Sequence, residues 1–123
     1  MIVRNMNIES LRNYCLGKED VTEEFPFGED TLVYKVKGKI FAITSLNDSP
    51  LSVNLKMRPD LVPDWRERYS EVMPGYHMNK KHWNTVSLTG RLKPSQIREM
   101  IDHSYDLVAA SLSKKEKEII AGL

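Results

Sequence analysis

The side chains that could perform catalysis are arranged in a way that argues against it. Asp102, His103 and Ser104 are consecutive, and successive side chains on a helix diverge by about 100°. They therefore cannot form a hydrogen-bonded triad with one another. The sequence also lacks a nucleophile elbow, a phosphate-binding loop and a dinucleotide-binding fingerprint. We expect no enzymatic activity and no catalytic residues.

The histidines, the cysteine and the adjacent carboxylates give no recognisable metal or acid–base site. His77 and His82 are five residues apart and have no second cysteine to join them, whereas zinc sites draw on several ligands at recognisable spacings. Cys15 lies on the apolar face of a predicted helix, which favours a buried, inert thiol. Glu23 and Glu24 are neighbours in a predicted strand and so point to opposite faces. We expect no metal and no cofactor.

Positive charge is concentrated in two parts of the chain. Residues 72–98 contain no acidic residue but include Lys80 and Lys81. Lys35, Lys37 and Lys39 occupy alternate positions around a predicted hairpin, which predicts that they leave the same sheet face. Such a face attracts phosphates by releasing condensed counterions. Lys80 and Lys81 are accompanied by aromatic and imidazole side chains, which can stack on unpaired bases or form hydrogen bonds: Tyr76, His77, His82 and Trp83.

These features support the hypothesis of low-specificity DNA binding through the hairpin and residues 76–83. The alternative is a solvated basic strand face with aromatic rings that pack in the core, because the net charge of only +1 is far below that of a typical nucleic-acid-binding domain. Residues 19–30 are acidic and contain no lysine or arginine. Separated acidic and basic segments predict a dipolar surface suited to docking a protein partner or to self-association.

Size and composition indicate one ordinary globular domain. The 123 residues fit the usual range of about 100–150, and 41% hydrophobic with 28% charged residues is typical of a folded chain. A single cysteine excludes an intrachain disulfide and suits a reducing compartment. The N-terminus has no signal-peptide core, and no apolar run approaches the roughly 20 residues of a membrane span. We expect a cytoplasmic protein that does not enter the membrane.

Hydrophobic periodicity predicts the elements that must position these residues. The first half contains a helix followed by strands with turn residues between them: helix 7–16 and strands 21–25, 31–37, 40–46 and 51–57. Gly38-Lys39 is predicted as the two-residue loop of the first long hairpin. Residues 51–57 place Leu51, Val53, Leu55 and Met57 on one face and Ser52, Asn54 and Lys56 on the other.

The second half is predicted to be mainly helical. A helix at 63–70 is ended by Met73-Pro74-Gly75, residues 76–83 are irregular, and 84–89 form a strand. Pro94 opens the longest helix, whose inward face comprises Ile97, Ile101, Ser104, Tyr105, Val108 and Leu112. A capping box at Ser113 predicts a final short helix. Neighbouring strands flanked by helices indicate an α+β fold, with an antiparallel sheet meander packed against helices on one face.

Several motifs resemble the MmcQ/YjbR family. The most specific runs from Pro74 to Val86, and the others occur in the family's order: Phe25-Pro26-Phe27-Gly28, Gly38-Lys39-Ile40-Phe41-Ala42, Leu55-Lys56 before Arg58-Pro59, and Ser104-Tyr105. The resemblance covers nearly the whole chain and implies a two-layer fold with hairpins that project as a double wing. Members are labelled predicted DNA-binding proteins. The fold is similar to that of small secretion-chaperone-like domains, so a non-enzymatic, chaperone-like interaction module is the alternative.

Overall fold

The computed structural model describes residues 6–47, 51–75 and 79–111, and within them the chain forms three helices and six strands. In chain order these are α1 (Ile8–Leu16), β1 (Val21–Glu24), β2 (Thr31–Val36), β3 (Lys39–Ser45), β4 (Ser52–Lys56), α2 (Val62–Arg68), β5 (Val72–Pro74), β6 (Trp83–Ser87) and α3 (Pro94–Ala110). The predicted final helix at Ser113 lies outside the described residues. Most predicted elements are present, with ends that differ by one or two residues.

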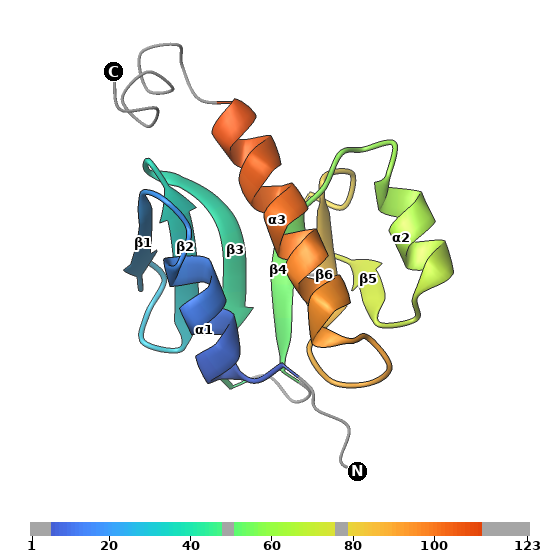
Figure 1. The fold of residues 1–123 in the computed structure, drawn as a ribbon, viewed down its shortest axis with the longest axis horizontal. Coiled ribbons are helices and arrows are strands. Elements are labelled where there is room, and N and C mark those ends of the chain that lie inside the picture. The colour runs from blue at the N-terminus through green and yellow to red at the C-terminus, as the bar shows by residue number, and fades with distance from the viewer. Residues whose placement is uncertain (1–5, 48–50, 76–78, 112–123) are drawn as a thin grey trace.

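All six strands form one antiparallel sheet in the order β1-β2-β3-β4-β6-β5. Helices α1 and α3 lie in front of this sheet in Figure 1, and α2 lies beside β5 at its edge. The predicted α+β class, an antiparallel sheet with helices on one face, is confirmed. Strand β5 corrects the prediction that Met73-Pro74-Gly75 only ends a helix, because Val72 to Pro74 pair with β6. Pro74 is compatible with this short strand because β5 is at the sheet edge.

The core lies between the sheet and the helices. Val53, Leu55 and Met57 are fully buried in it, as the alternation along this strand predicts. Ile97, Ile101 and Val108 of α3 pack against the same cluster, and Tyr105 is partly buried beside it; Leu112 lies outside the described residues. The opposite sheet face carries no helix among the described elements, and we call it the open face.

Ser104 joins α3 to the sheet where two strands separate. Strands β3 and β4 pair only through Ala42–Leu55 and Ile43–Asn54. Beyond these pairs the buried Ser104 hydroxyl accepts from the Lys56 amide at 2.9 Å and donates to the Phe41 carbonyl at 2.6 Å. The Ser104 hydroxyl thereby takes the place of a direct hydrogen bond between the two strands and satisfies one backbone amide and one backbone carbonyl.

The loop of the β2–β3 hairpin is Lys37-Gly38, one residue earlier than predicted. Val36 pairs with Lys39, so these two residues flank the turn. Lys37 has φ 47° and Gly38 has φ 82°, as a type I′ turn requires at its two central positions. Glycine is therefore at the second central position, and the turn interrupts the alternation of side chains along the chain.

Candidate nucleic-acid interface

The three hairpin lysines do not share a sheet face, which corrects the prediction from their spacing. Lys35 pairs with Thr22 and lies on the open face. Lys37 is in the turn. Lys39 is opposite the buried Val36 and therefore on the helix-covered side, where its ammonium donates to the Ser111 carbonyl at the end of α3 at 3.2 Å.

The acidic segment also neutralises this hairpin. Because β1 pairs with β2, Glu24 reaches Lys35 at 3.1 Å and Asp20 reaches Lys37 at 3.5 Å. On the other face Glu23 accepts from Arg12 at 2.8 Å. The acidic and basic stretches are separate along the chain but adjacent in space, so the predicted separation of charge is wrong for this part of the molecule. The predicted divergence of Glu23 and Glu24 is confirmed.

The second basic segment is a compact turn that carries Lys80 and Lys81. Its geometry is set by Asn79, whose carbonyl accepts from the amides of His82 and Trp83 and whose side chain accepts from the Lys81 amide at 2.9 Å. Both lysines are exposed. In the described ranges neither has an ion-pair partner. Tyr76 and His77 lie outside the described residues.

Two residues fix this turn against the fold. The Arg66 guanidinium of α2 donates to the Asn84 side chain at 2.7 Å and to the Lys80 carbonyl at 2.5 Å. Gly75 donates its amide to the Trp83 carbonyl, and a Cβ at position 75 would lie 2.9 Å from that oxygen. A side chain at position 75 would thus displace the turn. Neither contact was predicted, because no sequence pattern relates α2 to the turn.

The turn leads directly into a polar column on the open face. Lys56 of β4 is opposite Trp83 of β6, and both side chains are partly exposed. The next two pairs along the same strands carry small polar groups: Asn54 with Thr85, and Ser52 with Ser87. Trp83 is therefore neither fully buried nor fully exposed, and it is the cross-strand neighbour of Lys56 at the end of this polar column.

The hairpin and the turn lie at the same end of the sheet, but they are not continuous. The antiparallel order places the start of β3, the end of β4 and the start of β6 together at this end, which we call the hairpin end. Strand β4 lies between the two lysine groups. Lys56 at the end of β4, opposite Trp83, therefore adjoins the turn on the open face.

The side chains weighed for catalysis have structural roles. Cys15 is fully buried, and burial raises the pKa of its thiol to about 12, which confirms the predicted buried thiol. His103 Nε2 accepts from the Arg58 amide at 3.2 Å, so its Nδ1 carries the proton. Burial, with a smaller contribution from the Arg58 cation, lowers the pKa of His103. Ser104 is used by two strands, as described above.

Among the described residues, no group of three or more histidine, cysteine or acidic side chains is placed to hold a metal ion. No helix there is both long and apolar enough to cross a membrane.

Comparison with known proteins agrees with this architecture and these motifs. A crystal structure of the Deinococcus radiodurans protein DR2400 is similar with a TM-score of 0.88 and 34% identity, over 94% of this chain and 88% of that one. A crystal structure from Pseudomonas syringae has a TM-score of 0.74 and 29% identity, over 84% and 99% of the two chains. In each comparison the similar region includes most of this chain and most of the other protein. These similarities define the class of protein: a helix-backed antiparallel sheet of this shared fold.

Sequence relatives specify the family. The family model named YjbR matches residues 16–107. YjbR of Escherichia coli K12 is 31% identical over 118 residues, which is 96% of this chain and 100% of that protein. YbdF of Escherichia coli O157:H7 is 35% identical over 94 residues, 76% of this chain and 77% of that one. The chain belongs to the YjbR family, as its motifs indicate.

Proposed function

We propose that the protein binds single-stranded DNA with low sequence specificity, through the turn that carries Lys80 and Lys81 and the adjoining Lys56–Trp83 pair. The observation that carries this proposal is the contrast in pairing. Lys80 and Lys81 are exposed and have no ion-pair partner among the described residues, whereas Lys35 and Lys37 are each held by a carboxylate.

The column behind Trp83 suits unpaired bases. A partly exposed indole provides a stacking surface that tolerates any base, and the lysines contact the strand through its phosphates. On the same face, the next pair beyond Lys56 and Trp83 is Asn54 with Thr85, whose small polar side chains are joined by a hydrogen bond of 2.5 Å. We include His82 at the margin of this surface, because it is partly exposed beside Trp83. Low specificity follows, since stacking and phosphate contacts carry little sequence information.

The test is a salt titration of oligothymidine binding. A labelled strand of about 20 nucleotides exceeds the roughly 4–16 nucleotides that comparable sheet surfaces occupy. Fluorescence anisotropy should show binding at low ionic strength that weakens as salt is added. Substituting Lys80→Ala and Lys81→Ala together should reduce the slope of log affinity against log salt by about 1.4, or about 0.7 for each lost phosphate contact.

The matched control is the double variant Lys35→Ala and Lys37→Ala, which removes the same formal charge. It should leave the salt slope unchanged, because the carboxylates of Glu24 and Asp20 already neutralise these lysines. Equal losses in the two double variants would indicate an effect of net charge and would contradict the proposed site. Absence of any salt-dependent binding would overturn the proposal itself.

The proposal assigns no catalysis to this surface, and it places the protein in the cytoplasm, which the single buried thiol suits. A non-enzymatic protein-interaction module is the second candidate function. The specific observation in its favour is a group of exposed apolar side chains at the other end of the sheet: Phe25, Phe27 and Leu46. This group forms a surface separate from the turn at Lys80.

A further inference from the structure

Three exposed apolar side chains lie in the β1–β2 connection and just after β3, at the end of the sheet opposite the hairpin end. Phe25 is 49% exposed, Phe27 67% and Leu46 39%, and they account for all but one of the large hydrophobic side chains exposed in the described residues. Their loops adjoin, because Leu46 donates its amide to the Asp30 carbonyl at 2.7 Å. We call these three residues the aromatic tip.

The aromatic tip is presented by an ordered turn with an acidic rim. The Gly28 amide donates to the Phe25 carbonyl, and Gly28 has φ 116°, a conformation that glycine adopts without strain. Glu29 and Asp30 follow directly, and neither has an ion-pair partner among the residues that the structure describes. Exposed apolar groups with a polar rim mark interaction surfaces. The carboxylates disfavour contact of one tip with a second tip and favour a basic partner.

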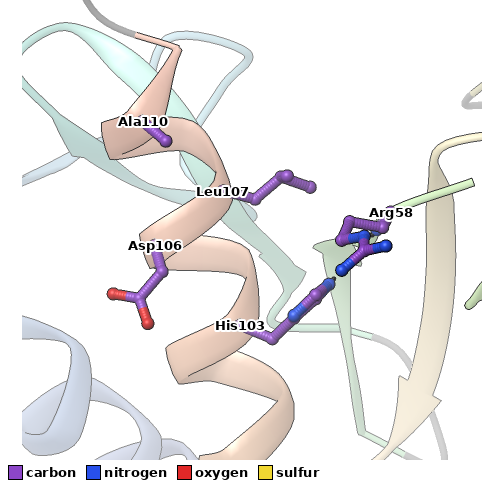
Figure 2. A pocket seen from close by; sticks show the side chains of 5 residues that line it. All are labelled: Arg58, His103, Asp106, Leu107 and Ala110. Atoms are coloured by element: carbon purple, nitrogen blue, oxygen red, sulfur yellow. Dashed lines mark hydrogen bonds between the residues drawn. The ribbon is translucent and has the colours of Figure 1, made fainter.

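A pocket at the hairpin end has the complementary chemistry. It has a volume of about 280 Å³ and is lined by Arg58, His103, Asp106, Leu107 and Ala110. Figure 2 shows Leu107 and His103 on the side of α3 that faces Arg58, with Asp106 pointing away from it. The apolar lining comes from Leu107 and Ala110. The Lys39 ammonium donates to the carbonyl of Ser111, the residue after α3, so two cations, Lys39 and Arg58, border the pocket together with the carboxylate of Asp106.

The size of the pocket limits its occupant. Sites for drug-sized ligands are usually about 300–1,000 Å³, so this pocket lies at the lower limit of that range and can accept a single large side chain. Arg58 pairs with Asp60 at 2.8 Å, but both side chains are more than half exposed. An exposed pair of this kind is weak, so another carboxylate can replace Asp60 at little cost.

We propose that the aromatic tip of one copy docks in the Arg58 pocket of a second copy, with Phe27 against Leu107 and the carboxylates of Glu29 and Asp30 near Arg58. The two surfaces lie at opposite ends of the molecule, so the contact is heterologous and joins copies head to tail. Charge complementarity and the match between one ring and one small pocket carry the inference. It rests on the second candidate function, protein interaction, and is independent of DNA binding.

The experiment is sedimentation velocity of the full chain over a concentration series, without nucleic acid. The wild-type protein should show a mass that increases with concentration and decreases with added salt. Phe27→Ser disables only the tip, and Ala110→Glu disables only the pocket by placing a carboxylate in it. Each variant should weaken self-association at least about tenfold, the loss typical of an interface anchor. Phe27 and Ala110 are exposed, so both variants should fold.

Mixing the two variants tests the head-to-tail geometry. The intact tip of Ala110→Glu can enter the intact pocket of Phe27→Ser, so the mixture should form a one-to-one dimer and nothing larger. Met73→Ser is the matched control, because Met73 is 47% exposed on the edge strand β5, away from both surfaces. It should associate like the wild type. A monomeric wild type, a monomeric mixture or equal loss with Met73→Ser would each overturn the inference. None of these results bears on oligothymidine binding.

Discussion

The β2–β3 hairpin and the turn at residues 79–83 carry similar lysines at the same end of one sheet, yet their environments differ. In the hairpin, Lys35 and Lys37 face carboxylates from β1, the neighbouring strand. In the turn, Lys80 and Lys81 extend from a backbone fixed by a guanidinium and an asparagine, with no carboxylate bound to them among the described residues. Whether a lysine is paired with a carboxylate therefore depends on the strand beside it more than on the local density of lysines.

The two regions also differ in how they are held. The hairpin is stabilised by its type I′ turn and by partly exposed ion pairs, which contribute little to stability. The turn is positioned by Arg66 and by the close approach of Gly75 to Trp83. The turn is thus held by α2 and by the residue that follows β5, whereas the hairpin is held by β1. Substitutions can test each part of this contrast.

The largest effect is expected at Ser104, which connects β3 of the hairpin to β4, the strand that lies between the two regions. Ser104→Ala leaves the Lys56 amide and the Phe41 carbonyl without their partner. An unsatisfied buried polar group costs about 1–3 kcal/mol, so the free energy of unfolding should decrease by about 3 kcal/mol. Urea denaturation measures this value. A loss below about 1 kcal/mol would contradict the bridging role, and Ser111→Ala at the exposed end of α3 provides the control.

A smaller effect is expected at Arg66, and it should be specific to the turn. Arg66→Ala removes hydrogen bonds to Asn84 and to the Lys80 carbonyl. Bonds to charged groups contribute about 1.5–3 kcal/mol when buried, and this partly exposed site should lose about 1.5 kcal/mol in urea denaturation. Arg66→Lys should not restore it, because an ammonium lacks the planar fork of donors. Full recovery in Arg66→Lys would show that charge alone positions the turn.

Sequence periodicity was sufficient to predict the layers of the fold, but it did not predict which side chains pair with one another on the surface. The alternation at Val53, Leu55 and Met57 and the apolar face of α3 identify the core correctly, because burial against one partner imposes a period on the sequence. Pairing between strands leaves no such signal. The register that brings Glu24 to Lys35 and the contact from Arg66 to the turn both depend on which elements become neighbours, which local patterns do not encode.

The exact position of short elements was the second feature that the sequence did not predict correctly. Moving the hairpin loop by one residue, to Lys37-Gly38, transfers Lys39 to the helix-covered side. A one-residue displacement reverses the face of every later side chain in a strand. Strand β5 was missed because its three residues include Pro74 and are too few to show a period. The basic character of the turn at Lys80 and Lys81 was predicted, because it depends on composition within one segment.

The free energy of unfolding should depend on pH through His103, which joins α3 to the segment after β4 by accepting from the Arg58 amide. Its folded-state pKa is lowered from the usual 6.5, so the unfolded chain binds a proton before the native protein does. The contribution of the neutral imidazole is complete above about pH 6.5 and is lost as the pH falls through the folded-state pKa. The wild type should therefore lose stability relative to His103→Gln between pH 7 and pH 5 in thermal unfolding. Parallel curves would show that His103 does not contribute.

The smallest effect is expected at the hairpin turn, and it separates charge from backbone conformation. Lys37 has φ 47° and Asp20 has φ 59°, a region that asparagine tolerates better than most residues. Asparagine before glycine is also the preferred sequence of a type I′ turn. Lys37→Asn and Asp20→Asn therefore remove the charges without imposing backbone strain, and the double-mutant cycle between them isolates the ion pair.

We expect a coupling energy below about 1 kcal/mol from this cycle, as is usual for exposed pairs, with Lys37→Asn as stable as the wild type in urea denaturation. Oligothymidine affinity should also stay within about twofold of the wild-type value, because the lost ammonium was already neutralised by Asp20. If Lys37→Asn alone instead reduced the salt slope by about 0.7, the value for one lost phosphate contact, Lys37 would exchange Asp20 for phosphate on binding. The hairpin and the turn would then form one surface across β4.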